Sequence, residues 1–171
     1  IFAICVETDA VHLYRRTGIT VNPVVGPPPT ACHDLFISEM VHMPGDQALA
    51  LEIYNPRSVP VDLTGYALRF YPNGEFSYDA SMLTGTIPAG GTHVVVAPNY
   101  TTNINTYADQ ITNLWFDGSD AIALVHNGTP IDIIGKVGEY FEDGDYWFNN
   151  GVGTFYTVIV RKPSVDRGDV D

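Results

Sequence analysis

Positive charge is scarce in this chain. Lysine and arginine number 8 in 171 residues, against 20 aspartates and glutamates, and the formal net charge is -12. Such an acidic chain repels a phosphate backbone, so we expect no nucleic-acid partner. The charge fits solubility, calcium binding or a basic partner. No apolar run of about 20 residues occurs, which argues against a transmembrane helix and against membrane insertion.

Reactive motifs are also missing. The five histidines are scattered, without His-x-His or His-Glu-x-x-His spacing, and no Cys-x-x-Cys occurs. Neither a Gly-x-Ser-x-Gly elbow, a P-loop nor a dinucleotide fingerprint is present. We therefore predict that the chain is not an enzyme, has no catalytic residues and needs no cofactor, with calcium left as a possible ligand.

Cysteine is limited to Cys5 and Cys32. In a secreted chain two such residues are expected to form a disulfide, which would close a loop of about 28 residues and contribute roughly 3–4 kcal/mol. The alternative is two unrelated buried thiols. The start, Ile1–Cys5, lacks the basic segment of a signal peptide, so we interpret the chain as a processed or excised piece.

Hydrophobic residues make up 45% of the chain, enough for a substantial core, and their pattern is that of strands. The central stretch, residues 48–70, alternates apolar and polar positions on both sides of a turn at Asn55-Pro56. The predicted strands cover residues 2–6, 11–14, 35–41, 48–54, 67–71, 81–86, 93–97, 121–126, 130–134 and 157–160, with one helical turn near 107–110. Short strands at this spacing predict an all-β, antiparallel β-sandwich.

The predicted domain boundary lies in a proline-rich connector, Gly26-Pro27-Pro28-Pro29. Residues 1–31 are expected to be an N-terminal extension, and residues 32–171 the sandwich domain. The extension either adds a strand to the sandwich or is the remnant of a preceding domain, and the sequence does not decide between these.

Five sequence blocks resemble one family. They are residues 38–39, 50–56 (ALEIYNP), 61–68 (VDLTGYAL), 116–124 (FDGSDAIAL) and 160–163 (VRKP). Together they resemble the lamin-tail domain family, in its bacterial secreted or surface branch, from residue 34 to about 164. The resemblance implies an immunoglobulin-like β-sandwich without established catalytic residues, in a protein that is secreted, extracellular or on the cell surface.

Two acidic loops are candidate sites. Asp117 and Asp120 in the first, with Asp143 and Asp145 in the second, carry oxygen ligands of the kind calcium prefers. For Asp117-Gly118 we favour the alternative of a turn in which the aspartate caps its own backbone.

The second loop, residues 139–150, also carries the candidate residues for a glycan or protein partner: Tyr140, Phe141, Tyr146, Trp147 and Phe148. Exposed aromatic rings stack on sugars or anchor a protein. The alternative is that Trp147 and Phe148 close the open end of the sandwich.

Glu39 and Glu52 lie on strands that we expect to pair. Two carboxylates can form an acid and base pair, but we favour a structural role in which they bind backbone amides, Arg57 or Arg161 and fix a corner of the sandwich.

The sequence thus predicts a non-enzymatic extracellular interaction module of a bacterial surface or secreted protein, used for adhesion, assembly with neighbouring copies or domain positioning. The alternative is an accessory ligand-binding module, glycan-binding or calcium-dependent, of a secreted hydrolase.

Overall fold

The computed structural model describes residues 2–7, 10–15, 33–43, 49–98, 103–113, 115–139, 146–149 and 152–170. The chain divides into two compact units, Ile1–His33 and Asp34–Asp171, and each is described by itself. The sequence analysis put this boundary two residues earlier. In the described parts of the chain, no helix is long and apolar enough to cross a membrane.

The described residues of the first unit form one hairpin. Strands β1 (Phe2–Glu7) and β2 (Ala10–Arg15) pair antiparallel in a two-stranded sheet of their own. This confirms the two strands predicted there. Cys32 lies outside the described residues, so the pairing of Cys5 with Cys32 stays a prediction.

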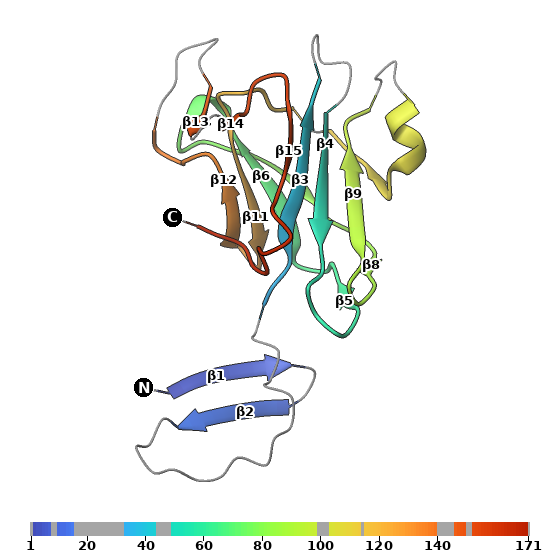
Figure 1. Cartoon of the computed structure of the whole chain (residues 1–171), viewed down its shortest axis with the longest axis vertical. Helices are drawn as coiled ribbons and strands as arrows, with labels where there is room; N and C mark the ends of the chain where they lie inside the picture. Colours follow the sequence, from blue (N-terminus) through green and yellow to red (C-terminus); the bar gives the residue numbers. More distant parts are fainter. Residues whose placement is uncertain are drawn as a thin grey trace. The chain divides into compact units, whose positions relative to one another are not determined.

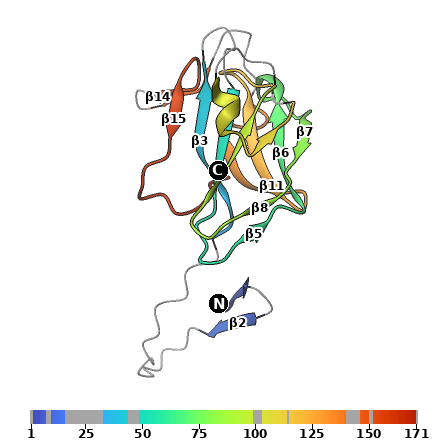
Figure 2. The same ribbon diagram turned by 90° about the vertical axis from the view of Figure 1, so that its right-hand side faces the viewer.

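The second unit is a sandwich of two main sheets, which Figure 2 shows as separate layers. The five-stranded sheet has the order β10-β9-β4-β3-β15, and the four-stranded sheet the order β12-β11-β6-β7. The bounds of these strands are β3 (Phe36–His42), β4 (Leu49–Tyr54), β6 (Tyr66–Tyr71), β7 (Asp79–Met82), β9 (Thr92–Val96), β10 (Gln110–Ile111), β11 (Ala121–His126), β12 (Thr129–Ile134) and β15 (Val158–Val160) (Figure 1).

Smaller elements complete the unit. Strands β5 (Val61–Asp62) and β8 (Thr86–Ile87) form one two-stranded sheet, and β13 (Phe148–Asn149) and β14 (Val152–Gly153) another. The 3-10 turns are η2 (Pro72–Gly74) and η3 (Asn103–Tyr107). The helical turn predicted at 107–110 therefore lies earlier, and the strand predicted at 81–86 is divided between β7 and β8.

Alternating side chains build the core between the sheets. Leu49, Leu51 and Ile53 of β4 face Leu68 and Phe70 of β6 in one buried cluster. The fold class predicted from the sequence is confirmed, because this is an immunoglobulin-like β-sandwich. One detail departs from it: the short β10 pairs parallel, not antiparallel, with β9.

The central stretch predicted from the sequence crosses between the sheets, since β4 and β6 belong to different layers. Asn55 stabilises the crossing. It is fully buried, its side-chain nitrogen donates to the carbonyl oxygens of Val59 and Pro88 at 2.9 and 3.0 Å, and its side-chain oxygen accepts from the Arg57 amide. Asparagine therefore satisfies buried backbone groups here, beyond marking a turn.

The turn at Asn127-Gly128 joins β11 to β12 as predicted. Both residues have positive φ, 48° and 82°, the requirement of a tight hairpin of the primed type. Directly beside it, Gly65 has φ +86°, and a Cβ there would lie 2.5 Å from the Asn127 side-chain oxygen. Glycine is thus required at the neighbouring corner.

Asp132 on β12 is a fully buried acid of the sandwich. It accepts hydrogen bonds from the Ile37 amide of β3, the Asp169 amide and the Arg161 guanidinium. Of the partners considered for Glu39 and Glu52, Arg161 therefore pairs with Asp132 instead. Glu52 instead accepts a hydrogen bond from the Ser38 hydroxyl at 2.6 Å.

Candidate functional site

Trp147 is the centre of the candidate site, and its backbone and ring are both anchored. Its amide lies 3.2 Å from the Gly118 carbonyl oxygen, and its indole N–H donates to the Asp120 carbonyl oxygen at 3.2 Å. The ring lies over Gly135, where a Cβ would come within 2.5 Å of the indole nitrogen. Both acidic loops predicted from the sequence therefore meet at this tryptophan.

The short β13–β14 hairpin follows Trp147 and is tied back by Thr154. The Thr154 amide donates to the Trp147 carbonyl oxygen at 3.0 Å. Its buried hydroxyl donates to the Gly118 carbonyl oxygen. Two strands of two residues do not hold a hairpin in place alone, so these bonds fix its base.

An aromatic patch surrounds this anchor, made of Tyr146, Phe148, Phe155 and Tyr156. Their exposed fractions are 42%, 66%, 38% and 44%. Tyr146 stacks on Phe155 at 6.0 Å and meets Phe148 edge-on at 6.2 Å, while Phe155 and Tyr156 lie 3.9 Å apart. Phe148 is exposed and therefore does not close the end of the sandwich, whereas Trp147 is half-buried.

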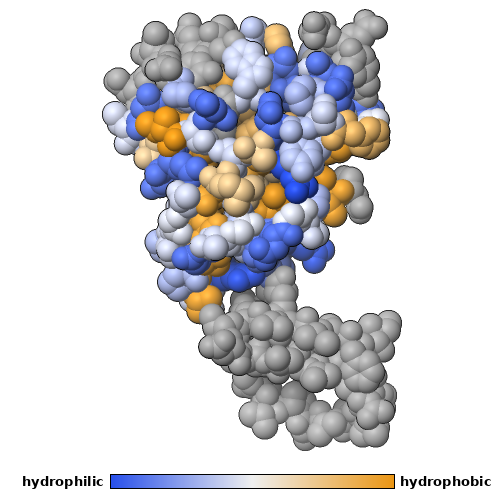
Figure 3. All heavy atoms as spheres, turned by 180° about the vertical axis from the view of Figure 1, so that it is seen from behind, coloured by the Kyte–Doolittle hydropathy of each residue, from blue (hydrophilic) through white to orange (hydrophobic). Residues whose placement is uncertain are grey.

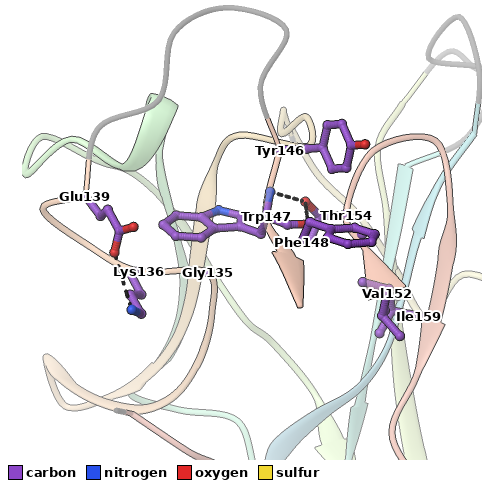
Figure 4. Close-up of a pocket in the computed structure, with 10 residues that line it drawn as sticks. Gly135, Lys136, Glu139, Tyr146, Trp147, Phe148, Val152, Thr154 and Ile159 are labelled. Carbon is purple, nitrogen blue, oxygen red and sulfur yellow. Dashed lines mark hydrogen bonds and ion pairs between the residues drawn. The ribbon is translucent and has the colours of Figure 1, made fainter. Parts of the chain in front are cut away.

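A pocket of about 500 Å³ lies beside the patch. Figure 4 shows the Trp147 ring extending toward Gly135 and the Lys136–Glu139 ion pair, with Tyr146 and Phe148 on its other side. The ion pair spans 3.4 Å between exposed side chains. The pocket thus offers an aromatic ring together with charged donors and acceptors, a combination that suits a sugar or a polar peptide segment.

The Asp117–Asp120 turn uses its carboxylates on neighbouring backbone amides. Asp120 accepts from the Asn73 amide at 2.8 Å and the Asp117 amide at 3.0 Å, and Asp117 accepts from the Ser119 amide at 2.8 Å and its hydroxyl at 2.6 Å. Burial raises the pKa of Asp120, although these amide bonds oppose the rise. This geometry is that of the capped turn favoured above.

The rest of the predicted calcium set, Asp143 and Asp145, lies outside the described residues, as do Tyr140 and Phe141 of the predicted partner site. Calcium binding and the role of those four residues stay predictions. Among the residues that the structure does describe, no group of three or more histidine, cysteine or acidic side chains is arranged to hold a metal ion.

One titratable cluster was missed by the sequence analysis. Asp34 accepts from the Tyr66 hydroxyl at 2.6 Å and lies 3.0 Å from His126 Nδ1 and 3.5 Å from Arg57. His126 stacks on the Tyr66 ring at 4.0 Å. Burial raises the pKa of Asp34, but the bonds from Tyr66, the Leu35 amide and His126 outweigh it and hold that pKa below its usual range.

This cluster joins the start of the sandwich to β6 and β11, and its chemistry is that of a structural network. The Tyr66 hydroxyl is committed to Asp34, and burial with that contact raises the pKa of Tyr66 well above its usual range. A phenol that is harder to ionise is a poorer nucleophile at neutral pH. Only the position of Asp34 ahead of the first sandwich strand could have suggested the cluster from sequence.

Comparison with known proteins identifies one family. A family model described as Lamin Tail Domain matches residues 28–138, more than half of the chain. Four of the five sequence blocks lie inside the match, and the block at 160–163 lies beyond its end. None of the curated proteins matches this chain.

Proposed function

The chain belongs to the lamin tail domain family, and on that premise we propose that it serves as a non-enzymatic interaction module of a bacterial surface or secreted protein. Its role would be adhesion, assembly with neighbouring copies, or positioning of other domains. The family supports an immunoglobulin-like domain that is typically non-catalytic. The acidic charge and the two cysteines are compatible with an extracellular location.

The observation that carries the proposal is the aromatic patch beside an unpaired sheet edge. β15 is the last strand of the five-stranded sheet, and among the described residues no strand pairs with its outer side. The Thr157 carbonyl oxygen accepts from the His42 amide, and the Arg161 amide donates to the Ser38 carbonyl oxygen, both toward β3. Backbone groups of successive residues point to opposite sides of a strand, so those of Val158 and Val160 point to the outer side. Exposed apolar surface next to free backbone groups suits a strand added by a partner or a second copy.

Size-exclusion chromatography with light scattering tests this proposal. We expect the molar mass of the wild-type chain to rise with concentration. The variants Phe148→Ser and Val160→Lys should each keep the molar mass of a monomer. Phe76→Ser is the matched control, since Phe76 is 79% exposed elsewhere on the sandwich. A wild-type protein that stays monomeric at every concentration would contradict assembly through this edge.

The second candidate function is an accessory ligand-binding module of a secreted hydrolase, favoured by the pocket beside Trp147. Replacing Trp115, the only other tryptophan, with phenylalanine makes Trp147 the sole tryptophan, so that excitation at a wavelength where tyrosine does not absorb reports on Trp147 alone. Titration with neutral oligosaccharides, with and without millimolar calcium, should then shift its emission if sugars stack there. An unchanged spectrum across a panel of oligosaccharides argues against glycan binding.

A further inference from the structure

A shallow pocket of about 340 Å³, separate from the pocket beside Trp147, lies on the outer face of the four-stranded sheet. We call it the Arg69 groove. Its lining includes Ala67, Arg69, Tyr78, Ala80, Met82 and Val125. Except for Tyr78, which precedes β7, these residues lie on strands and alternate with residues of the main core such as Leu68, so their side chains face away from that core. Ala67 and Val125 belong to a second buried cluster on this outer face. Figure 3 views the molecule from this side and shows apolar residues across the middle of the face among hydrophilic ones.

The floor of the groove is unusually apolar for an outer sheet face. Ala67 and Val125 are paired in register and almost fully buried, and Met82, opposite Ala67 on β7, is 59% exposed. Small residues on neighbouring strands leave a depression between larger side chains. A water-facing strand would ordinarily alternate apolar core residues with polar outer ones. Met82 and Ala80 are exposed, so they are the apolar surface of the groove that suits a side chain from another molecule.

Arg69 gives the groove its charge. Its guanidinium carbon lies 4.5 Å from the centre of the Tyr78 ring, which holds the flat group against one wall. Arg57 and Arg161 each lie within 4.0 Å of an aspartate, whereas no carboxylate among the described residues comes that near Arg69. In a chain with 20 acidic residues, a half-buried arginine that has no carboxylate of the described residues within 4.0 Å points to an anionic partner.

We propose that the Arg69 groove binds an acidic peptide segment of a partner protein, in which a carboxylate pairs with Arg69 and a neighbouring aromatic or long aliphatic side chain lies against Met82 and Ala80. A single cation in a chain of net charge -12 disfavours a nucleic-acid strand, which needs many phosphate contacts. The inference rests on the proposed function in taking the domain as a binding module, but it uses a different sheet from the aromatic patch.

Fluorescence anisotropy with defined peptides tests the proposal. The probe is a fluorescein-labelled peptide of glycine and glutamate around one central phenylalanine. Its two comparison peptides carry lysine in place of glutamate, or serine in place of phenylalanine. We expect the wild-type chain to bind the acidic phenylalanine peptide most tightly, with weaker binding at higher salt. Equal binding of all three peptides, or binding of none, would overturn the proposal.

Matched variants locate the site. Arg69→Glu should weaken binding at least about tenfold, because attraction becomes repulsion. Lys162→Glu changes the net charge equally at an exposed position outside the groove and should leave affinity within about twofold. Ala80→Tyr fills the groove from an exposed position and should also abolish peptide binding. This second variant tests the proposal even if Arg69→Glu destabilises the fold.

The outcomes separate the two proposals. Wild-type affinity in both Arg69→Glu and Ala80→Tyr would place peptide binding elsewhere and overturn this inference. If the chain self-associates through Phe148 but does not bind the acidic peptide, the proposal for the Arg69 groove is wrong. The proposed function as an interaction module is then still supported.

Discussion

At the scale of single residues, Asp34 is the acid whose ionised form the sandwich stabilises. Its carboxylate receives the Tyr66 hydroxyl, the Leu35 amide and His126, and its pKa lies below the ordinary 3.8. A carboxyl group with a lowered folded-state pKa contributes stability that is fully present above its unfolded pKa. That contribution is lost as the pH falls through the folded-state value.

We therefore predict that Asp34→Asn lowers the free energy of unfolding at pH 7 by about 1–3 kcal/mol, the usual contribution of hydrogen bonds to a charged group. The difference from wild type should shrink as the pH falls from about 5 toward 2, because the wild-type acid becomes protonated. Urea unfolding across this pH range measures it.

The control for that experiment is Asp79→Asn, which removes the same charge at an exposed position of β7. Burial raises the pKa of Asp120 and Asp132, so these two acids act in the opposite direction over the same pH range. The comparison must therefore be between each variant and the wild type. A difference at Asp34 that does not change with pH would show that the carboxylate charge is not what stabilises the cluster.

At the scale of elements, Gly135 and Trp147 couple the end of β12 to the β13–β14 hairpin. Gly135 has φ +79°, and a methyl group there would clash with the indole. We predict that Gly135→Ala displaces the ring and destabilises the protein by about 1–3 kcal/mol. In the Trp115→Phe background, the emission of Trp147 should shift to the red and become easier to quench.

Gly90→Ala is the matched control, because Gly90 also has positive φ but a Cβ there meets only the Tyr54 hydroxyl, at 3.9 Å. It should show the backbone cost without the change in fluorescence. Identical emission from Gly135→Ala and its parent would mean that the indole is not held against this glycine.

The same scale includes the buried pair that joins the two sheets. Asp132 of β12 bonds to β3, to Arg161 after β15 and to the Asp169 amide. We predict that Arg161→Met costs about 3–5 kcal/mol, because it leaves a buried carboxylate without its cation. Combining it with Asp132→Leu should restore part of this loss, and urea unfolding of the two single variants and the double variant measures the coupling. Additive losses would refute a direct interaction.

Most strands could be predicted from the alternation of apolar and polar residues, because one face of such a strand packs on the core and the other faces water. It did not reveal which sheet a strand joins, because β4 and β6 bury the same kinds of side chain in either layer. The sequence analysis did not single out Asp132, because one carboxylate within a predicted strand carries no signal of burial; here the acid is fully buried and Ile133 packs against the cluster on the outer face. The Trp147–Asp120 junction runs through a backbone carbonyl, which carries no side-chain signal.

At the scale of the whole molecule, the hydrophobic core among the described residues lies in the second unit. The main hydrophobic cluster begins at Leu35 and reaches Leu124, and the partly buried residues against it end at Ile159. The family match also falls mostly within this unit. A unit with its own core and both of its sheets is expected to fold without its neighbour.

We therefore predict that residues 34–171 alone unfold in urea with the same midpoint as the full chain, and with nearly the same dependence on urea, because the surface exposed on unfolding is mostly that of the sandwich. A β1–β2 hairpin alone is at best marginally stable in water and adds little to the transition. A clearly lower midpoint for the shortened chain would show that residues 1–33 stabilise the sandwich. If the midpoints agree but only the full chain associates, the first unit supplies the contact between copies, and the β15 edge becomes the place to look for its receptor.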